Sequence, residues 1–192
     1  RQFVIGDGEE ALIDLLELVA RAREANAGRE ELLRQLATVP GVYVPALYQV
    51  DYKPDGTVAD VRPTVPEAPE RVLKRIVPTL PRALTAPIVP YVQTTHDRAV
   101  IEIARGCTRG CRFCHAGIVT RPVRERPVPE VLAAIDALLA NTGYEEVALL
   151  SLSSSDYSGI TELVTAITEK YGDRRLGISL PSLRIESSSA DL

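Results

Sequence analysis

The stretch PEVLAAIDALLANTGYEEVALLSLS, residues 129–153, changes its hydrophobic pattern once along its length. In its first part Leu132, Ile135 and Leu139 recur three or four residues apart, which predicts an amphipathic helix that ends near Gly143. The run EEVALLSLS that follows is short and mostly apolar, as expected for a buried strand. The stretch therefore predicts a helix that leads directly into a strand of an α/β sheet.

The same alternation continues on both sides of this stretch. AVIEIA at 99–104 predicts a strand, YSGITELVTAITEKYG at 157–172 predicts a helix, and RRLGISL at 174–180 predicts another strand. Apolar residues recur at helical spacing in that helix: Ile160, Leu163, Val164 and Ile167. The β-α-β-α-β order predicts a parallel sheet with right-handed crossovers. A complete eight-stranded (βα) barrel takes about 250 residues. We therefore expect the first half of a partial TIM-like barrel, with an open sheet edge that further sequence or another chain covers.

The amino-terminal part predicts a strand-turn-helix unit of its own. RQFVIGDGEEALIDLLELVARAREAN at 1–26 reads as a short strand, a glycine turn and a helix, and REELLRQLATV predicts a second helix before Pro40. The first helix has a predicted apolar face: Leu12, Leu15, Leu16 and Val19.

A proline-rich connector separates the two parts. Ten of the fourteen prolines lie between Pro40 and Pro90. Alternating residues around Asp55 and Gly56 predict a hairpin there, and PERVLKRIV at 69–77 predicts a short helix. The predicted regions are an amino-terminal α/β piece, the connector, and the first part of a barrel: 1–38, 39–96 and 97–192.

Composition limits the classes of protein. With 45% hydrophobic and 25% charged residues the chain is typical of a globular protein, and its apolar runs are shorter than the roughly 18 residues of a membrane span. The net charge of -4 gives no general attraction to nucleic-acid phosphates. An odd number of cysteines in one segment argues against a secreted disulfide framework. We expect a cytoplasmic protein that does not bind membranes.

All three cysteines lie in EIARGCTRGCRFCHAG, residues 102–117, directly after a predicted strand: Cys107, Cys111 and Cys114. The carboxyl end of a strand is where ligands collect in βα sheets and barrels. Three thiolates can hold three corners of a four-iron cluster and leave the fourth iron open. A zinc site needs a fourth ligand, and His115 and His96 are badly placed for it.

Glycines and arginines accompany the cysteines. Glycines allow the backbone to curl tightly around an inorganic centre, and arginines are expected to offset the charge of thiolates. The residues in question are Gly106, Gly110, Gly117, Arg105, Arg109 and Arg112.

CTRGCRFC resembles the three-cysteine pattern of the radical S-adenosylmethionine (SAM) superfamily, with the aromatic Phe113 before the last cysteine. The resemblance implies a 4Fe-4S cluster on Cys107, Cys111 and Cys114, whose open iron binds the amino and carboxylate groups of SAM. It further implies that Phe113 lies against the adenine. The reduced cluster would cleave SAM to methionine and a 5'-deoxyadenosyl radical, which abstracts hydrogen from a substrate.

Residues beyond the cysteines are similar to a cobalamin-binding subgroup of that superfamily, in RPVRERPVPEV, TGYEEVALLSLSSSDYSGITELV and ISLPSLRIES. The resemblance implies that Ser153, Ser154, Ser155 and Asp156 receive the methionine amino group, although the glycine pair of many members is missing. By position alone, the same residues could equally cap the following helix. Arg184 is a candidate partner for the methionine carboxylate or a substrate anion, or one half of a surface salt bridge.

VIGDGEEALIDLLEL resembles the last strand-turn-helix of a Rossmann-like cobalamin-binding domain. The resemblance implies close backbone approach at Gly6 and Gly8, with Glu9 facing the nucleotide tail. Acidic residues after glycines are also ordinary at the start of a helix. We expect cobalamin to bind only to a full-length protein that this chain is part of.

The resulting functional hypothesis is a radical SAM enzyme segment, used in cobalamin-dependent methyl transfer. One alternative is a methylthiotransferase-like tRNA or ribosomal modification enzyme, which would need a second cluster and further cysteines. Another is a non-catalytic metal- or RNA-binding module, although Arg121, Arg124 and Arg126 are a weak phosphate footprint and suit the barrel rim better. The expected partners are an electron donor such as flavodoxin or ferredoxin and an unidentified substrate, for which RNA is one candidate.

Overall fold

A parallel three-stranded sheet organises the carboxyl-terminal part of the chain. The computed structural model describes residues 1–92 and 94–184 and divides into two compact units, Arg1–Val77 (unit 1) and Pro78–Leu192 (unit 2). In unit 2 the strands β5 (Ala99–Glu102), β8 (Glu146–Leu150) and β9 (Gly177–Ser179) follow the order β5-β8-β9, and both pairings are parallel. This confirms the parallel sheet predicted from the sequence.

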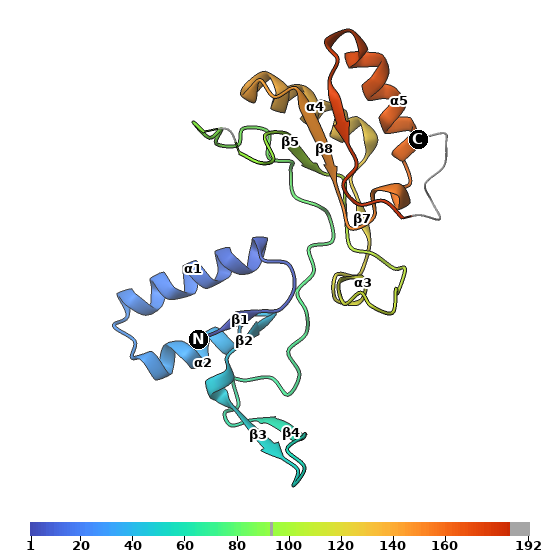
Figure 1. The fold of residues 1–192 in the computed structure, drawn as a ribbon. Coiled ribbons are helices and arrows are strands. Elements are labelled where there is room, and N and C mark those ends of the chain that lie inside the picture. The colour runs from blue at the N-terminus through green and yellow to red at the C-terminus, as the bar shows by residue number, and fades with distance from the viewer. Residues whose placement is uncertain (93, 185–192) are drawn as a thin grey trace. The chain divides into compact units, whose positions relative to one another are not determined.

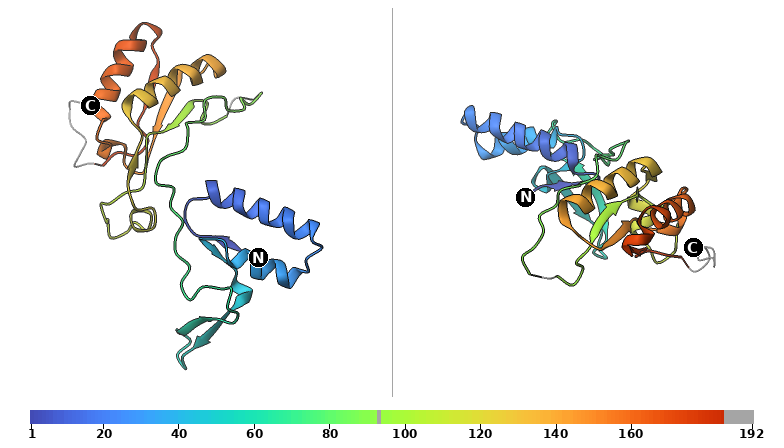
Figure 2. Two further views of the ribbon diagram at one scale, coloured as in Figure 1. Left: turned by 180° about the vertical axis from the view of Figure 1, so that it is seen from behind. Right: turned by 90° about the horizontal axis from the view of Figure 1, so that it is seen from above.

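Two helices connect these strands and pack against the sheet (Figures 1 and 2). They are α4 (Val128–Thr142) and α5 (Ile160–Tyr171). The left-handed Gly143 ends α4, and its N–H bonds the carbonyl oxygen of Leu139. The apolar faces of strands and helices form one core whose fully buried members include Ile101, Ile103, Ile135, Leu138, Leu149, Leu163 and Ile167. The predicted helical faces of unit 2 are confirmed, because all their members are buried in or packed against this core.

Short elements complete unit 2 at both ends of the sheet. The strand β6 (Ala104–Arg105) pairs antiparallel with β7 (Arg124–Glu125), so residues 106–123 form a closed excursion that we call the cysteine loop. It contains the one-turn helix α3 (Ala116–Val119). The 3-10 turns η2 (Ser154–Asp156) and η3 (Gly172–Arg174) follow β8 and α5.

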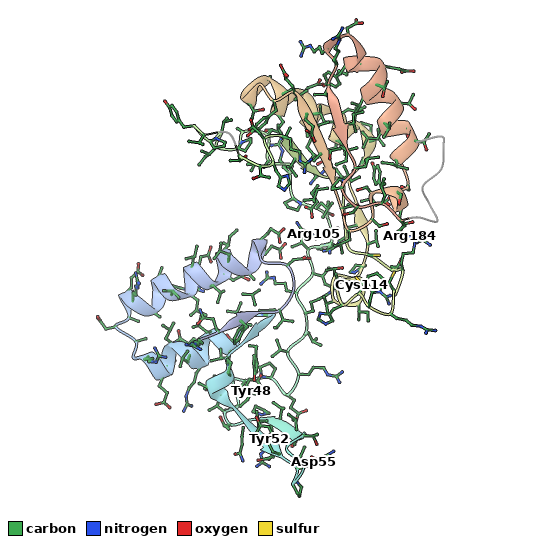
Figure 3. All side chains as sticks on the ribbon, viewed as in Figure 1. Tyr48, Tyr52, Asp55, Arg105, Cys114 and Arg184 are labelled. Atoms are coloured by element: carbon green, nitrogen blue, oxygen red, sulfur yellow. The ribbon has the colours of Figure 1, made fainter. Side chains whose placement is uncertain are left out.

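Unit 1 combines two helices with two small antiparallel sheets. Helices α1 (Glu9–Glu24) and α2 (Arg29–Ala37) contact each other, and β1 (Phe3–Val4) pairs with β2 (Val42–Tyr43). After the turn η1 (Pro45–Leu47), the strands β3 (Tyr48–Tyr52) and β4 (Val58–Pro63) form the predicted hairpin. Tyr48, Tyr52 and Asp55 mark its length in Figure 3.

The predicted helix at 69–77 is wrong. That segment contains no helix: it bends at Glu70 and Arg71, and Arg75 forms an isolated parallel bridge with Gly6. The N–H of Arg75 bonds Ile5 O at 2.9 Å, and the N–H of Asp7 bonds Arg75 O at 3.0 Å. The Arg75 guanidinium also pairs with Glu10 and Asp14 of α1. Strand-like pairing with the segment around Gly6, within unit 1, therefore outweighs the local helical pattern.

The predicted face of α1 is only half correct. Leu15 is buried and Val19 packs against the unit 1 core, whereas Leu12 and Leu16 are 58% and 61% exposed. The proline-rich region contributes to both units, since Val44 and Leu47 lie in the unit 1 core and Ala83 packs against that of unit 2.

Candidate functional site

The cysteine loop lies at the carboxyl end of β5. Cys111 is exposed, Cys107 and Cys114 are half-buried, and all three are free thiols. The Arg109 N–H donates to Cys107 Sγ at 3.5 Å, and the Cys114 N–H donates to Cys111 O at 2.9 Å. Figure 3 shows Cys114 at the same end of unit 2 as Arg105 and Arg184. The loop therefore presents its sulfur atoms where strand ends and solvent meet.

Two glycines shape the start of this loop. Gly106 has φ +91° and Gly110 has φ +66°, in the region that favours glycine. A Cβ on Gly106 would lie 2.5 Å from Pro122 O and 2.7 Å from Thr120 O. Gly117 is different: it lies in α3, and the nearest atom to an added Cβ is Gly110 N at 3.8 Å. Of the three glycines proposed to curl the loop, the structure requires two.

Asp156 joins the cysteine loop to the end of β8. Arg109 donates Nε to Asp156 Oδ2 at 3.0 Å and Nη2 to Oδ1 at 2.6 Å. Ser153 Oγ donates to Oδ2 at 2.7 Å, and Arg184 Nη1 lies 3.4 Å from the same oxygen. Burial raises the pKa of Asp156, but hydrogen bonds from Arg109 and Ser153 and the charges of both arginines lower it below its ordinary value. The carboxylate is therefore ionised at neutral pH.

The serines after β8 have separate roles. Ser154 is fully buried, and its Oγ donates to Leu149 O at 3.0 Å while its N–H donates to Ser182 O at 2.7 Å. Ser155 Oγ accepts the Arg184 N–H at 3.3 Å. The predicted cap is wrong, because α5 begins at Ile160 after Gly159 and, in the described part of the chain, no side chain caps it. The run instead ties β8 to the segment after β9.

A cavity of about 180 Å³ opens among these segments. It is smaller than the roughly 300–1,000 Å³ of sites that enclose a drug-sized ligand, so it fits only part of one. Its lining joins the cysteine loop to the end of β8 and includes Gly106, Cys107, Arg109, Ser153, Asp156 and Tyr157.

Several predicted site residues are not among those that line this cavity. The Phe113 side chain is 92% exposed. Gly6, Gly8 and Glu9 belong to unit 1, and a Cβ on Gly6 would lie 2.1 Å from Arg75 O. At Gly6 the backbone is therefore closely approached by Arg75 of the same chain, and this contact already explains why a glycine is needed there.

The arginines near the cysteines differ from their predicted role. Arg105 makes a bidentate pair with Glu102, at 2.7 and 2.9 Å, and Arg109 pairs with Asp156, so carboxylates already offset both charges. Arg124 and Arg126 are buried, which argues against the alternative that they contact nucleic-acid phosphates. Arg126 donates to Glu102 O at 3.1 Å and to Pro81 O at 2.8 Å.

Tyr157 lines the cavity and was missed by the sequence reasoning, which offered no signal for it. The residue is 4% exposed, and its hydroxyl donates to Arg126 O at 2.7 Å. Burial, followed by the charges of Glu125 and Glu162, raises the pKa of Tyr157 to about 12.

We therefore expect alkaline conditions to destabilise unit 2. Because the folded-state pKa of Tyr157 lies above its ordinary value of 10, its contribution is complete below pH 10 and is lost as the pH rises toward 12. Tyr171 has a pKa raised in the same direction by burial and by Asp136, and it adds to this loss. Urea unfolding of wild type and Tyr157→Phe between pH 10 and 12 tests the expectation. A stability difference between the two proteins that does not change with pH would contradict it.

The donor set suits a cluster better than a single ion. Among the residues that the structure describes, no group of three His, Cys, Asp or Glu side chains is placed to hold one metal ion. A four-iron cluster presents separate irons to its ligands, so three thiolates need not converge on one point. Three accessible cysteines on one glycine-shaped loop therefore fit such a cluster.

Two family models match the chain. Residues 101–191 match the radical SAM superfamily, and residues 2–45 match the amino-terminal model of radical SAM proteins. The first match contains the three cysteines, Asp156 and Arg184. None of the helices in residues 1–92 and 94–184 is long and apolar enough to cross a membrane.

Three curated relatives show the level of similarity. A ribosomal protein uS12 methylthiotransferase of Moorella thermoacetica is 30% identical over 181 residues, which are 91% of this chain and 38% of that protein. An uncharacterized protein of Methanocaldococcus jannaschii is 32% identical over 126 residues, 62% of this chain and 27% of that protein. A tRNA-2-methylthio-N(6)-dimethylallyladenosine synthase of a Psychrobacter species is 37% identical over 71 residues, 37% of this chain and 14% of that protein. The chain thus spans well under half the length of these relatives.

Proposed function

We propose that the cysteine loop holds a 4Fe-4S cluster on Cys107, Cys111 and Cys114 and that SAM binds beside this cluster. The proposal starts from the match of the chain to radical SAM superfamily domains. The observation that carries the proposal is the position of this loop at the carboxyl end of β5, with Cys107 lining the same cavity as Ser153 and Asp156. When bound, such a cluster supplies one-electron chemistry to SAM for starting radical reactions.

The residues around the loop support binding and orientation in this proposal. Gly106 and Gly110 set the path of the backbone, and Cys107 accepts a main-chain N–H that directs its sulfur. The cavity fits one end of a ligand, and we assign it the methionine part of SAM. Phe113 and Arg184 stay proposed contacts of the adenine and the carboxylate.

A finer proposal concerns the reaction. Similarity over 91% of the chain to a protein named a ribosomal protein uS12 methylthiotransferase favours methylthio transfer to a ribosomal protein. The shorter match to a tRNA-2-methylthio-N(6)-dimethylallyladenosine synthase makes an RNA the second candidate substrate. Cobalamin-dependent methyl transfer, with residues 1–38 as the tail of a cobalamin-binding domain, is the alternative. The two differ in an observable: the alternative requires cobalamin absorbance in the full-length protein, and methylthio transfer requires a substrate product that contains sulfur.

Anaerobic reconstitution tests the core of the proposal. We expect about four irons per wild-type chain and an electron paramagnetic resonance (EPR) signal of the reduced cluster that changes shape when SAM is added. Cys114→Ser should lose the cluster, because one of its three ligands is removed. His115→Ala is the matched control next to it and should keep the iron. Zinc binding without a cluster, or iron loss in His115→Ala, would contradict the proposal.

A further inference from the structure

Asp156 is the point where the ends of three strands are joined. Arg109 comes from the loop after β5, Ser153 and Asp156 follow β8, and Arg184 follows β9. All three side chains contact the Asp156 carboxylate, at 2.6 to 3.4 Å. We call these four residues the Asp156 junction.

The contact with Arg109 fixes an orientation as well as a distance. Two N–H groups of a planar guanidinium bind the two oxygens of one carboxylate, which is the most directional form of ion pair. The main-chain N–H of the same arginine bonds Cys107 Sγ. The junction is thus linked through one residue to a cysteine of the loop.

The carboxylate oxygens are largely occupied. Oδ2 accepts from Arg109 and Ser153 and lies within reach of Arg184, and Oδ1 accepts from Arg109. A carboxylate oxygen has about two lone-pair positions. Oδ2 therefore has no position left and Oδ1 keeps one, and three donors from the loop after β5 and the segments after β8 and β9 already hold the group. This geometry suits a structural partner of the loop better than a ligand contact.

We infer that Asp156 is a positioning residue, which holds the cysteine loop through Arg109 before and after a cluster binds. The inference rests on the proposed function for the reason why the loop is held, namely cluster binding. The hold itself, the Arg109–Asp156 ion pair, is a property of the chain without a cluster. The inference also changes the role expected for Asp156, from a receiver of the methionine amino group to an anchor of the loop that carries the cluster ligands.

Hydrogen exchange in the full chain tests the anchor without any cluster. In Asp156→Asn we expect amides of residues 106–119 to exchange about twofold to fivefold faster than in wild type, a modest effect because Arg109 is half exposed and the pair is partly screened. After reconstitution, iron should be lost to a chelator faster by a similar factor. Arg109→Lys keeps the charge without the two-pronged contact and should give an intermediate result.

Asp136→Asn is the matched control. Asp136 also accepts from a cation and a hydroxyl, Lys170 and Tyr171, but it lies in α4. This variant should leave exchange in 106–119 and iron retention unchanged.

The outcomes separate the inference from the proposed function. Wild-type exchange and iron retention in Asp156→Asn would overturn the inference. If Asp156→Asn in addition loses the change of the EPR signal on addition of SAM, the inference is also overturned, because Asp156 would then act on SAM and not on the loop. If wild type takes up no iron, the proposed function fails, and the exchange rates of the cluster-free chain still decide the role of Asp156.

Discussion

Replacing Gly106 by alanine should remove most of the cluster-binding capacity of the chain. The new Cβ would lie 2.5 and 2.7 Å from two main-chain oxygens, which no side-chain movement can relieve, at a φ of +91°. The conformational cost alone is about 1–2 kcal/mol, and the steric cost adds to it. We therefore expect at least about a tenfold loss of bound iron after reconstitution, with the circular dichroism spectrum of the chain retained.

Gly117→Ala is the control for this change. It introduces the same methyl group into the same loop, but the nearest atom is 3.8 Å away. Iron content and EPR signal should match wild type. Equal iron loading in both variants would show that the path of the loop at Gly106 is not needed for binding.

Replacing Arg126 by leucine should strongly destabilise unit 2. The side chain is 2% exposed and supplies hydrogen bonds to Glu102 O, Pro81 O and Glu130. Leucine leaves these partly buried oxygens without their donors, which we expect to cost about 2–4 kcal/mol in total. Urea unfolding followed by circular dichroism should show the lower free energy of unfolding.

Arg112→Leu removes the same charge from an exposed position and should change the free energy of unfolding by less than about 0.5 kcal/mol. If the two leucine variants have similar stability, Arg126 does not act as a buried connector between β5, α4 and the segment near Pro81.

The sequence predicted best what depends on hydrophobic periodicity. Leu163 and Ile167 recur at helical spacing and lie in the core, and the short apolar run at 146–150 is a central strand with a partner on each side. The hairpin at Asp55 and Gly56 was visible for a similar reason, because its turn residues and alternation are local.

Contacts between distant residues were not visible in the same way. The segment around Arg75 has a helical pattern, yet it pairs with Gly6, about seventy positions earlier in the chain. Arg126 resembles a surface charge in composition, and only the carbonyl oxygens that surround it make its burial favourable. Asp156 was proposed from its place after β8, and in the structure it lines the cavity beside Cys107, but no spacing rule connects it with Arg109.

The parallel sheet also affects how the site is made during protein synthesis. Its strands follow each other in the chain and are neighbours in space, so Cys107, Asp156 and Arg184 come together through contacts between successive segments. Domains fold as units while the ribosome extends the chain at about 5–20 residues per second. We therefore expect the cysteine loop to acquire its anchor as soon as β9 and Arg184 have emerged from the ribosome, before later segments emerge. A nascent chain stalled far enough beyond Arg184 for β9 to lie outside the ribosome should then already protect residues 106–119 from proteolysis.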